Sequence, residues 1–131
     1  MIIFVKHMAK HNNLGRSGEQ LAAEYLKNKG YTVLDRNWRS GHKELDLVVR
    51  NDTTLVVVEV KTRSGTCFGR PEDAVDARKI YRTVLAADAY VRFKCLDMDV
   101  RFDIVTVIYS KGDVSVEHIE NAFYPTVECR R

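Results

Sequence analysis

Apolar positions in the first third of the chain predict a helix followed by a strand. Within residues 15–30 (GRSGEQLAAEYLKNKG) they recur at helical spacing, as on the buried face of an amphipathic helix. Ser17 and Gln20 match a capping box at the start of this helix, although Asn13 is an alternative cap. Gly30 is a natural C-terminal stop, and the segment YTVLDRNW after it is typical of a strand. The apolar helix positions are Leu21, Ala22, Tyr25 and Leu26.

Two apolar runs in the middle of the chain predict a β-hairpin. The runs ELDLVV and LVVVEVK flank a turn at residues 51–54, which lacks the favoured glycine. We expect the hairpin to be centred in the middle of this turn, so that Asp46 faces Glu59. In the same register Glu44 faces Lys61. The opposite face carries only apolar side chains, which must pack against a helix: Leu45, Leu47, Val49, Val56, Val58 and Val60.

The rest of the chain predicts a second helix and two further strands. Pro71 follows a loop rich in Gly and Arg and opens a helix over roughly residues 72–93. The segments VRFDIVTVIY and VSVEHI are typical of strands, and SKGD forms a tight turn between them. The element order αβββαββ indicates an α/β (α+β) domain with a mixed central sheet flanked by helices. The apolar face of the second helix is expected at Ala74, Ala77, Tyr81, Val84 and Leu85.

Length and composition indicate one globular domain and leave the partner open. The chain has 131 residues, of which 45% are hydrophobic and 30% charged, which is ordinary for a folded protein. A net charge of +3 permits a polyanionic partner without requiring one. We expect a flexible tail over residues 1–12, with Met8 as a second plausible start, a single domain over 13–124 and a C-terminal tail over 125–131.

Cysteine usage and the N-terminal residues favour a cytoplasmic protein with no membrane contact. Three cysteines, an odd number without a Cys-x-x-Cys pair, indicate neither a disulfide framework nor a zinc site. The apolar stretch in MIIFVKH is too short for a signal peptide or a membrane span.

Charged side chains gather at one end of the predicted hairpin. Facing residues in a hairpin have Cβ atoms about 5 Å apart, and like charges at that distance destabilise a sheet. Water, a shared proton or a cation would relieve the repulsion between Asp46 and Glu59. A divalent ion such as Mg²⁺ commonly takes one or two carboxylates, and Lys61 would then lie beside it. The equally weighted alternative is a Glu44–Lys61 ion pair, with both acids solvated at the end of the sheet.

The motif around these residues resembles the signature of the PD-(D/E)XK nuclease superfamily. That signature is an acid, here Asp46, followed on the next strand by Glu59-Val60-Lys61. The runs GRSGEQLAAEYLKNKGY, ELDLVV, LVVVEVKTRS, FGRPEDAVDARK and RFDIV resemble the YraN-like family of predicted bacterial nucleases. The layout is also similar to the archaeal Holliday-junction resolvases. The chain departs from the family where Lys43 stands before Glu44 in place of a more usual Gly, and where Ile80 follows Lys79 in place of a frequent Gln.

The resemblance implies a restriction-endonuclease-like core and a nuclease dependent on Mg²⁺ or Mn²⁺. It implies hydrolysis of phosphodiester bonds in DNA, with branched DNA or recombination intermediates as candidate substrates. Asp46 and Glu59 would bind the metal, with the carbonyl of Val60 as a further ligand. Lys61 would be the catalytic lysine and Glu19 the additional helical acid, while Glu44 supports the site. Glu19 has an equal alternative role in stabilising the helix dipole. A homodimer is suggested by analogy with the resolvases.

A basic stretch follows the proposed site in the sequence and is a candidate nucleic-acid contact. Phosphate contacts of this kind give position and affinity without reading bases. The alternative is a solvated helix face balanced by nearby acids. For Asp103 we favour a structural pairing with an arginine over a catalytic role. The basic residues are Arg63, Arg70, Arg78, Lys79 and Arg82.

Three functions are compatible with the sequence. The first is the metal-dependent nuclease. The second is a catalytically inactive nucleic-acid-binding module that keeps the nuclease fold. The third is a structural or partner-binding protein, in which the charged cluster is a solvated group of ion pairs.

Overall fold

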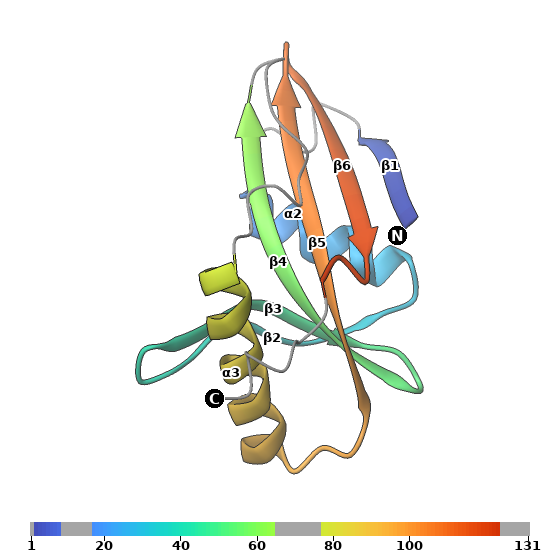
Figure 1. The fold of residues 1–131 in the computed structure, drawn as a ribbon. Coiled ribbons are helices and arrows are strands. Elements are labelled where there is room, and N and C mark those ends of the chain that lie inside the picture. The colour runs from blue at the N-terminus through green and yellow to red at the C-terminus, as the bar shows by residue number, and fades with distance from the viewer. Residues whose placement is uncertain (1, 9–16, 65–76, 124–131) are drawn as a thin grey trace.

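One mixed sheet runs through the computed structural model, which describes residues 2–8, 17–64 and 77–123 (Figure 1). Its six strands lie in the order β1-β6-β5-β4-β3-β2. Strands β4 and β5 are parallel, and each of the other neighbouring pairs is antiparallel. The strands are β1 (Ile2–Met8), β2 (Thr32–Ser40), β3 (Lys43–Arg50), β4 (Thr54–Ser64), β5 (Asp99–Ser110) and β6 (Asp113–Glu120). The predicted order αβββαββ and the α+β class are confirmed, with β1 added in front.

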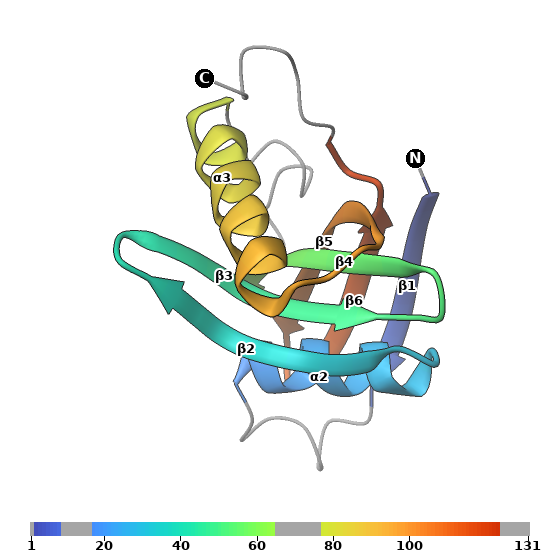
Figure 2. The same cartoon turned by 90° about the horizontal axis from the view of Figure 1, so that it is seen from below.

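The two helices of the described residues cover opposite faces of the sheet (Figure 2). Helix α2 (Gly18–Asn28) begins at the predicted capping box, in which Ser17 Oγ accepts from the Gln20 backbone N–H and Gln20 Oε1 accepts from the Ser17 backbone N–H. Helix α3 (Ala77–Lys94) lies in the connection between β4 and β5. These strands are parallel, and parallel neighbours need a long crossover, which is usually a helix. Neither helix is long and apolar enough to span a membrane.

Strand β1 differs from the flexible tail that we expected over residues 1–12. Ile2–Met8 pairs with β6 along its length, from Ile2–Glu120 to Met8–Val114. The physical reason is that β6 would otherwise leave a row of backbone N–H and C=O groups unpaired at the edge of the sheet. Residues 9–16 and the expected C-terminal tail at 125–131 lie outside the described residues.

The hairpin of β3 and β4 has the predicted register, from Leu47–Val58 to Arg50–Leu55. Its turn needs no glycine because the side chain of Asn51 takes over part of the hydrogen bonding. Asn51 Oδ1 accepts from the backbone N–H groups of Thr53 and Thr54, at 3.0 and 2.8 Å. This side-chain turn also tolerates the Asp and Thr residues of the loop.

Buried apolar side chains form one cluster on each face of the hairpin. Leu47, Val49, Val56 and Val58 pack with α2, as one face of the predicted hairpin requires. The cluster on the α3 face includes Val48, Leu55, Val57, Ala86, Ala87, Tyr90, Phe102 and Ile104.

Leu45 belongs to the α3 cluster, which corrects the prediction that it shares a face with Leu47. Its β2 partner Trp38 lies on the same side and meets Tyr90 edge to face, with ring centroids 5.2 Å apart. Between Trp38 and Arg36 the chain passes through Asn37, whose φ is +50°. The β2–β3 register pairs Arg36 with Leu47 and Trp38 with Leu45 but leaves out Asn37 with Asp46, so the two-residue alternation breaks there.

The buried face of α3 is also rotated from the predicted one. Thr83, Ala86, Ala87 and Tyr90 are buried, whereas Ala77 is exposed. The sequence of α3 carries apolar residues on most sides, so periodicity alone selects its buried face poorly. Ala74 and the predicted start of this helix, including Pro71, lie outside the described residues.

Candidate active site

Asp46 lies where β3 leaves β4 and where the ladder between β3 and β2 skips one pair. The ladder with β4 ends at the Leu47–Val58 pair and so stops one residue short of Asp46. The ladder with β2 omits Asp46 but continues beyond it. The carboxylate fills this gap, since Asp46 Oδ2 accepts a hydrogen bond of 2.9 Å from the backbone N–H of Val60. A side chain therefore connects β3 to β4 at the point where backbone pairing stops.

The electrostatic setting of Asp46 is unfavourable to its negative charge. Burial is the main cause that raises its pKa, and the charge of Glu59 is the second; together they bring the pKa to about 6. The hydrogen bond from Val60 and the charge of Lys79 oppose the rise, while Glu19 adds to it. The structure thus brings Asp46 and Glu59 close enough to repel each other, with Glu19 as a weaker contributor.

Glu59 is 8% exposed and is neutralised by ammonium groups from two elements. Lys61 Nζ of β4 lies 3.1 Å from Glu59 Oε2, and Lys79 Nζ of α3 lies 3.6 Å from the same oxygen. A buried carboxylate is costly unless it is paired, and these two contacts provide the pairing. Glu59, Lys61 and Lys79 therefore form a connected group on the α3 side of the sheet.

Glu44 does not pair with Lys61, contrary to the prediction from the extended hairpin. Its carboxylate Oε2 lies 3.4 Å from Nε of Arg39, its partner across the β2–β3 ladder. The reason is the end of the β3–β4 ladder at Leu47–Val58, beyond which β3 follows β2 instead of β4. Glu44 is also half exposed, so this ion pair is a surface contact.

Glu19 is held at the start of α2 by a contact with β2. Asn37 Nδ2 donates to Glu19 Oε1 at 2.9 Å, so the residue that breaks the β2–β3 alternation also orients this acid. Gly18 allows α2 to approach β4 closely, because a Cβ atom there would lie 2.3 Å from Thr62 Oγ1. This approach sets the position of Glu19 relative to the strand that carries Glu59 and Lys61.

Among the side chains of the described residues, the carboxylates of Asp46 and Glu59 are the candidate metal ligands. In residues 17–64 and 77–123, no group of three or more His, Cys, Asp or Glu side chains is arranged to hold a metal. Asp46 and Glu59 nevertheless fit a hard divalent cation, which takes oxygen ligands and commonly one or two carboxylates, with water completing its shell. A cation would also relieve the repulsion that raises the pKa of Asp46.

The proposed nucleic-acid contacts are only partly brought together. Arg78 and Arg82 are exposed on the first turns of α3, and Lys79 lies between them, beside Glu59. Arg63 donates from Nη1 to the carbonyl of Thr62, at 3.2 Å, on β4. Arg70 lies outside the described residues.

A cleft of about 340 Å³ lies between the β2–β3 hairpin and the first turns of α3. Lys79 and Arg82 line it from the helix, and His42 and Lys43 line it from the hairpin. His42 and Lys43 were not predicted from the sequence as site residues. Their signal was weak, because the turn SGHK has the composition of any exposed loop.

Asp103 has the structural role that we favoured, with a larger network than the sequence indicated. Arg101 donates to it from Nε at 2.9 Å and from Nη2 at 2.8 Å, and His118 Nε2 lies 2.7 Å from its Oδ2. Burial alone would raise its pKa, but hydrogen bonds from His118, Arg101 and the Asn121 N–H outweigh burial and lower it. Tyr25 Oη lies 3.2 Å from His118 Nδ1 and connects the network to α2. The places of His118 and Tyr25 in this network were not predicted from the sequence.

Comparison with known proteins shows the family of the chain. The model of Uncharacterised protein family UPF0102 matches residues 18–107. The chain belongs to this family. A UPF0102 protein of Bacteroides thetaiotaomicron is 55% identical over 118 residues, covering 90% of the chain and 98% of the relative. A UPF0102 protein of Phocaeicola vulgatus is 51% identical, covering 92% and 99%, and one of Flavobacterium psychrophilum is 44% identical, covering 89% and 98%.

Membership of UPF0102 confirms the resemblance to the YraN-like family of predicted nucleases. The matched residues 18–107 include Glu19, Asp46, Glu59 and Lys61, and they end before His118. The match thus spans the whole candidate site and only part of the Asp103 network.

Proposed function

We propose that this UPF0102 protein is a nuclease that hydrolyses phosphodiester bonds of DNA with Mg²⁺ or Mn²⁺. The observation that carries the proposal is the hydrogen bond from the Val60 N–H to Asp46, which fixes this acid beside the Glu59–Lys61 ion pair at the point where β3 and β4 separate. A buried acid, Glu59, and a half-buried acid, Asp46, that repel each other are costly to maintain, and a cation site is a physical reason to keep them. Family membership supports the proposal, because the resemblance to predicted nucleases covers the same residues.

In this proposal Asp46 and Glu59 hold the metal, with the carbonyl of Val60 as a further ligand. The metal would supply Lewis acidity toward the phosphate and a more acidic water. The N–H of Val60 fixes Asp46 by its hydrogen bond of 2.9 Å to Oδ2. Lys61 directs an ammonium group at the same place, where it orients the attacking water or stabilises charge on the phosphate. Glu19 supports the site from α2, and Asn37 orients it.

The proposed substrate is DNA, with branched molecules or recombination intermediates as candidates. The proposed location of the protein is the cytoplasm. The exposed Arg78 and Arg82 and the neighbouring Lys79 would contact phosphates next to the acids.

Cleavage assays with matched variants test the proposal. Branched, duplex and single-stranded DNA are incubated with wild type, Asp46→Asn, Lys61→Ala and Lys27→Ala, each with Mg²⁺, Mn²⁺ or EDTA. Lys27 is exposed in the last turn of α2 and serves as the control lysine. We expect metal-dependent products with wild type and Lys27→Ala, and a loss of at least about 100-fold with the two site variants. Equal cleavage by all four proteins, or none by wild type on any substrate, would refute the proposal.

A second candidate function is a nucleic-acid-binding module without turnover. The observation in its favour is that Lys61 and Lys79 already neutralise Glu59. This module would bind DNA with a strong salt dependence and give no metal-dependent product. Titration calorimetry with Mn²⁺ separates the two candidates, since only the nuclease predicts binding that is lost in Glu59→Ala. A structural protein, the third candidate, predicts binding of neither Mn²⁺ nor nucleic acid.

A further inference from the structure

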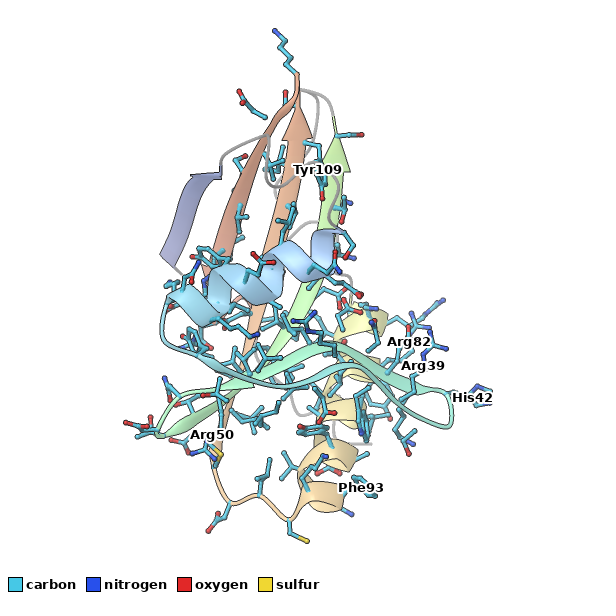
Figure 3. All side chains as sticks on the ribbon, turned by 180° about the vertical axis from the view of Figure 1, so that it is seen from behind. Arg39, His42, Arg50, Arg82, Phe93 and Tyr109 are labelled. Atoms are coloured by element: carbon cyan, nitrogen blue, oxygen red, sulfur yellow. The ribbon has the colours of Figure 1, made fainter. Side chains whose placement is uncertain are left out.

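The cleft between the β2–β3 hairpin and α3 has basic side chains on both of its walls. His42 and Lys43 come from the hairpin, and Lys79 and Arg82 come from the helix, with Thr83 and Leu85 also lining it. Figure 3 places Arg39, His42 and Arg82 together on this side of the molecule, away from Arg50 and Phe93. The cleft is therefore a two-walled site, unlike a basic face on a single helix.

The charge of the cleft favours an anion. Lys43, Lys79 and Arg82 contribute positive charge, and Glu44 is the acid among the lining residues. Arg39 lies 3.4 Å from Glu44 and offsets part of its negative charge. A concave site with an excess of one sign of charge concentrates ligands of the opposite sign.

The cleft adjoins the candidate active site through Lys79. This lysine lines the cleft, and its Nζ is also 3.6 Å from Glu59 Oε2. An anion bound to Lys79 in the cleft would thus be one side chain away from Glu59. A strand that has one phosphate at the acids can place a neighbouring phosphate in the cleft. A compact isolated anion has no second phosphate to place there.

The shape and lining of the cleft suit the backbone of one strand. It is a concave space of about 340 Å³ with basic residues on both walls. Proteins that bind single strands use a positively charged groove that follows the backbone.

We propose that this cleft binds the phosphate backbone of a single nucleic-acid strand as it approaches the acid pair. The inference rests on the proposed nuclease function and specifies its substrate, a nucleic acid with a single-stranded segment next to the cleaved bond. Lys43 and Arg82 hold the strand from opposite walls. Glu44 weakens the binding by repulsion, which gives it a role opposite to supporting the metal site.

The test measures binding without catalysis. Fluorescence anisotropy is recorded with a labelled single-stranded oligonucleotide in EDTA over a series of salt concentrations. Lys43→Gln and Arg82→Ala should each lower affinity by about 3- to 10-fold and reduce the slope of log K against log salt by about 0.7. Lys111→Gln and Arg92→Ala are matched controls, since Lys111 lies at another hairpin turn and Arg92 is exposed in the last turn of the same helix. Controls and cleft variants that behave alike would overturn the proposal.

Glu44→Gln gives a prediction of opposite sign. It should tighten single-strand binding by about two- to fivefold, because a repulsive charge is removed. Unchanged or weaker binding would contradict the proposal. A duplex of the same length should lose little affinity in Lys43→Gln and Arg82→Ala, and equal losses on duplex and single strand would overturn the preference for one strand. Since no metal is present, failure here leaves the nuclease assays intact, and absence of cleavage leaves these binding results intact.

Discussion

Asp46 Oδ2 accepts a hydrogen bond of 2.9 Å from the backbone N–H of Val60, one step beyond the last paired residues of β3 and β4. The carboxylate takes the place of the missing backbone acceptor for a partly buried amide, which would otherwise be costly. It is thereby fixed against the strand segment that carries Glu59 and Lys61. Asp46, which is proposed to bind metal, therefore also has a structural role.

Asp46→Asn should stabilise the protein at neutral pH. The pKa of Asp46 is raised from 3.8 to about 6 by burial and by Glu59, so the folded state binds the proton more tightly than the unfolded state. The free energy of unfolding therefore falls as pH rises from about 4 to about 6, and the cost persists above that range, at most about 3 kcal/mol. Asparagine keeps an acceptor for Val60 and does not ionise. Urea unfolding in EDTA should show Asp46→Asn more stable than wild type at pH 7.5 and equal to it at pH 4.

Asp52→Asn is the control for this experiment, because Asp52 is exposed in the turn of the same hairpin. It should match wild type at both pH values. A variant Asp46→Asn that is less stable than wild type at pH 7.5 would mean that the ionised carboxylate is well solvated or paired in the folded state.

Lys79→Gln should strengthen metal binding while weakening nucleic-acid binding. The Lys79 ammonium is 3.6 Å from Glu59 Oε2 and competes with a cation for that carboxylate. Its loss should lower the Kd for Mn²⁺ by about three- to tenfold, a modest gain because the lysine is partly exposed. Titration calorimetry measures the change. Lys94→Gln, near the other end of α3 and 3.5 Å from Asp35, is the matched control; weaker Mn²⁺ binding in Lys79→Gln would contradict the proposed site.

Gly18→Ala should destabilise the protein through its contact with β4. A Cβ at Gly18 would lie 2.3 Å from Thr62 Oγ1 but 3.6 Å from Thr62 Cβ, which is ordinary contact. The cost should be about 1–3 kcal/mol, as for overpacking elsewhere. Thr62→Ala removes the clashing oxygen, so the double variant should recover most of the loss. Urea unfolding of the two single variants and the double variant gives the coupling energy, and additive effects would refute the close approach.

Asp103→Asn should cost about 3–5 kcal/mol at pH 7, because it leaves the buried His118 and the part-buried Arg101 without their shared charge. The pKa of Asp103 is lowered, since hydrogen bonds from His118 and Arg101 outweigh its burial. The Asp103 carboxylate therefore stabilises the fold at pH values above its unfolded-state pKa, near 3.8. This stabilisation is lost as pH falls below that value.

Urea unfolding measures the difference in the free energy of unfolding between wild type and Asp103→Asn. This difference should narrow as pH falls below about 4. Asp88→Asn, at an exposed position of α3, should change stability by less than about 0.5 kcal/mol. A small effect of Asp103→Asn at pH 7 would show that the network is not structural. Mn²⁺ binding to folded Asp103→Asn should equal that of wild type, which separates this acid from Asp46 and Glu59.

Much of the candidate site could be predicted because short-range signals encode it. The capping box at Ser17 begins α2 and places Glu19 in its first turn, and the turn at Asn51 fixes the register of the hairpin. From that register Asp46 and Glu59 were expected to face each other. The β3–β4 ladder ends at Leu47–Val58, one pair short of them, but the charge of Glu59 still raises the pKa of Asp46. Local hydrogen bonds and the two-residue period of strands are properties of neighbouring residues, so they can be read from the chain.

The partners of the outer residues could not be predicted in this way. Glu44 binds Arg39 and Leu45 turns to the α3 face, because β3 separates from β4 before Asp46 and because Asn37 breaks the alternation of β2. The two-residue alternation of a strand does not show where its pairing stops, whereas a β-ladder ends where twist and packing separate the strands. The chain by itself determined the cap of α2, the turn of the hairpin and its register, and so which residues are candidates for the chemistry. Packing of the sheet between two helices decided which of them meet, since contacts between distant segments depend on where the strands diverge.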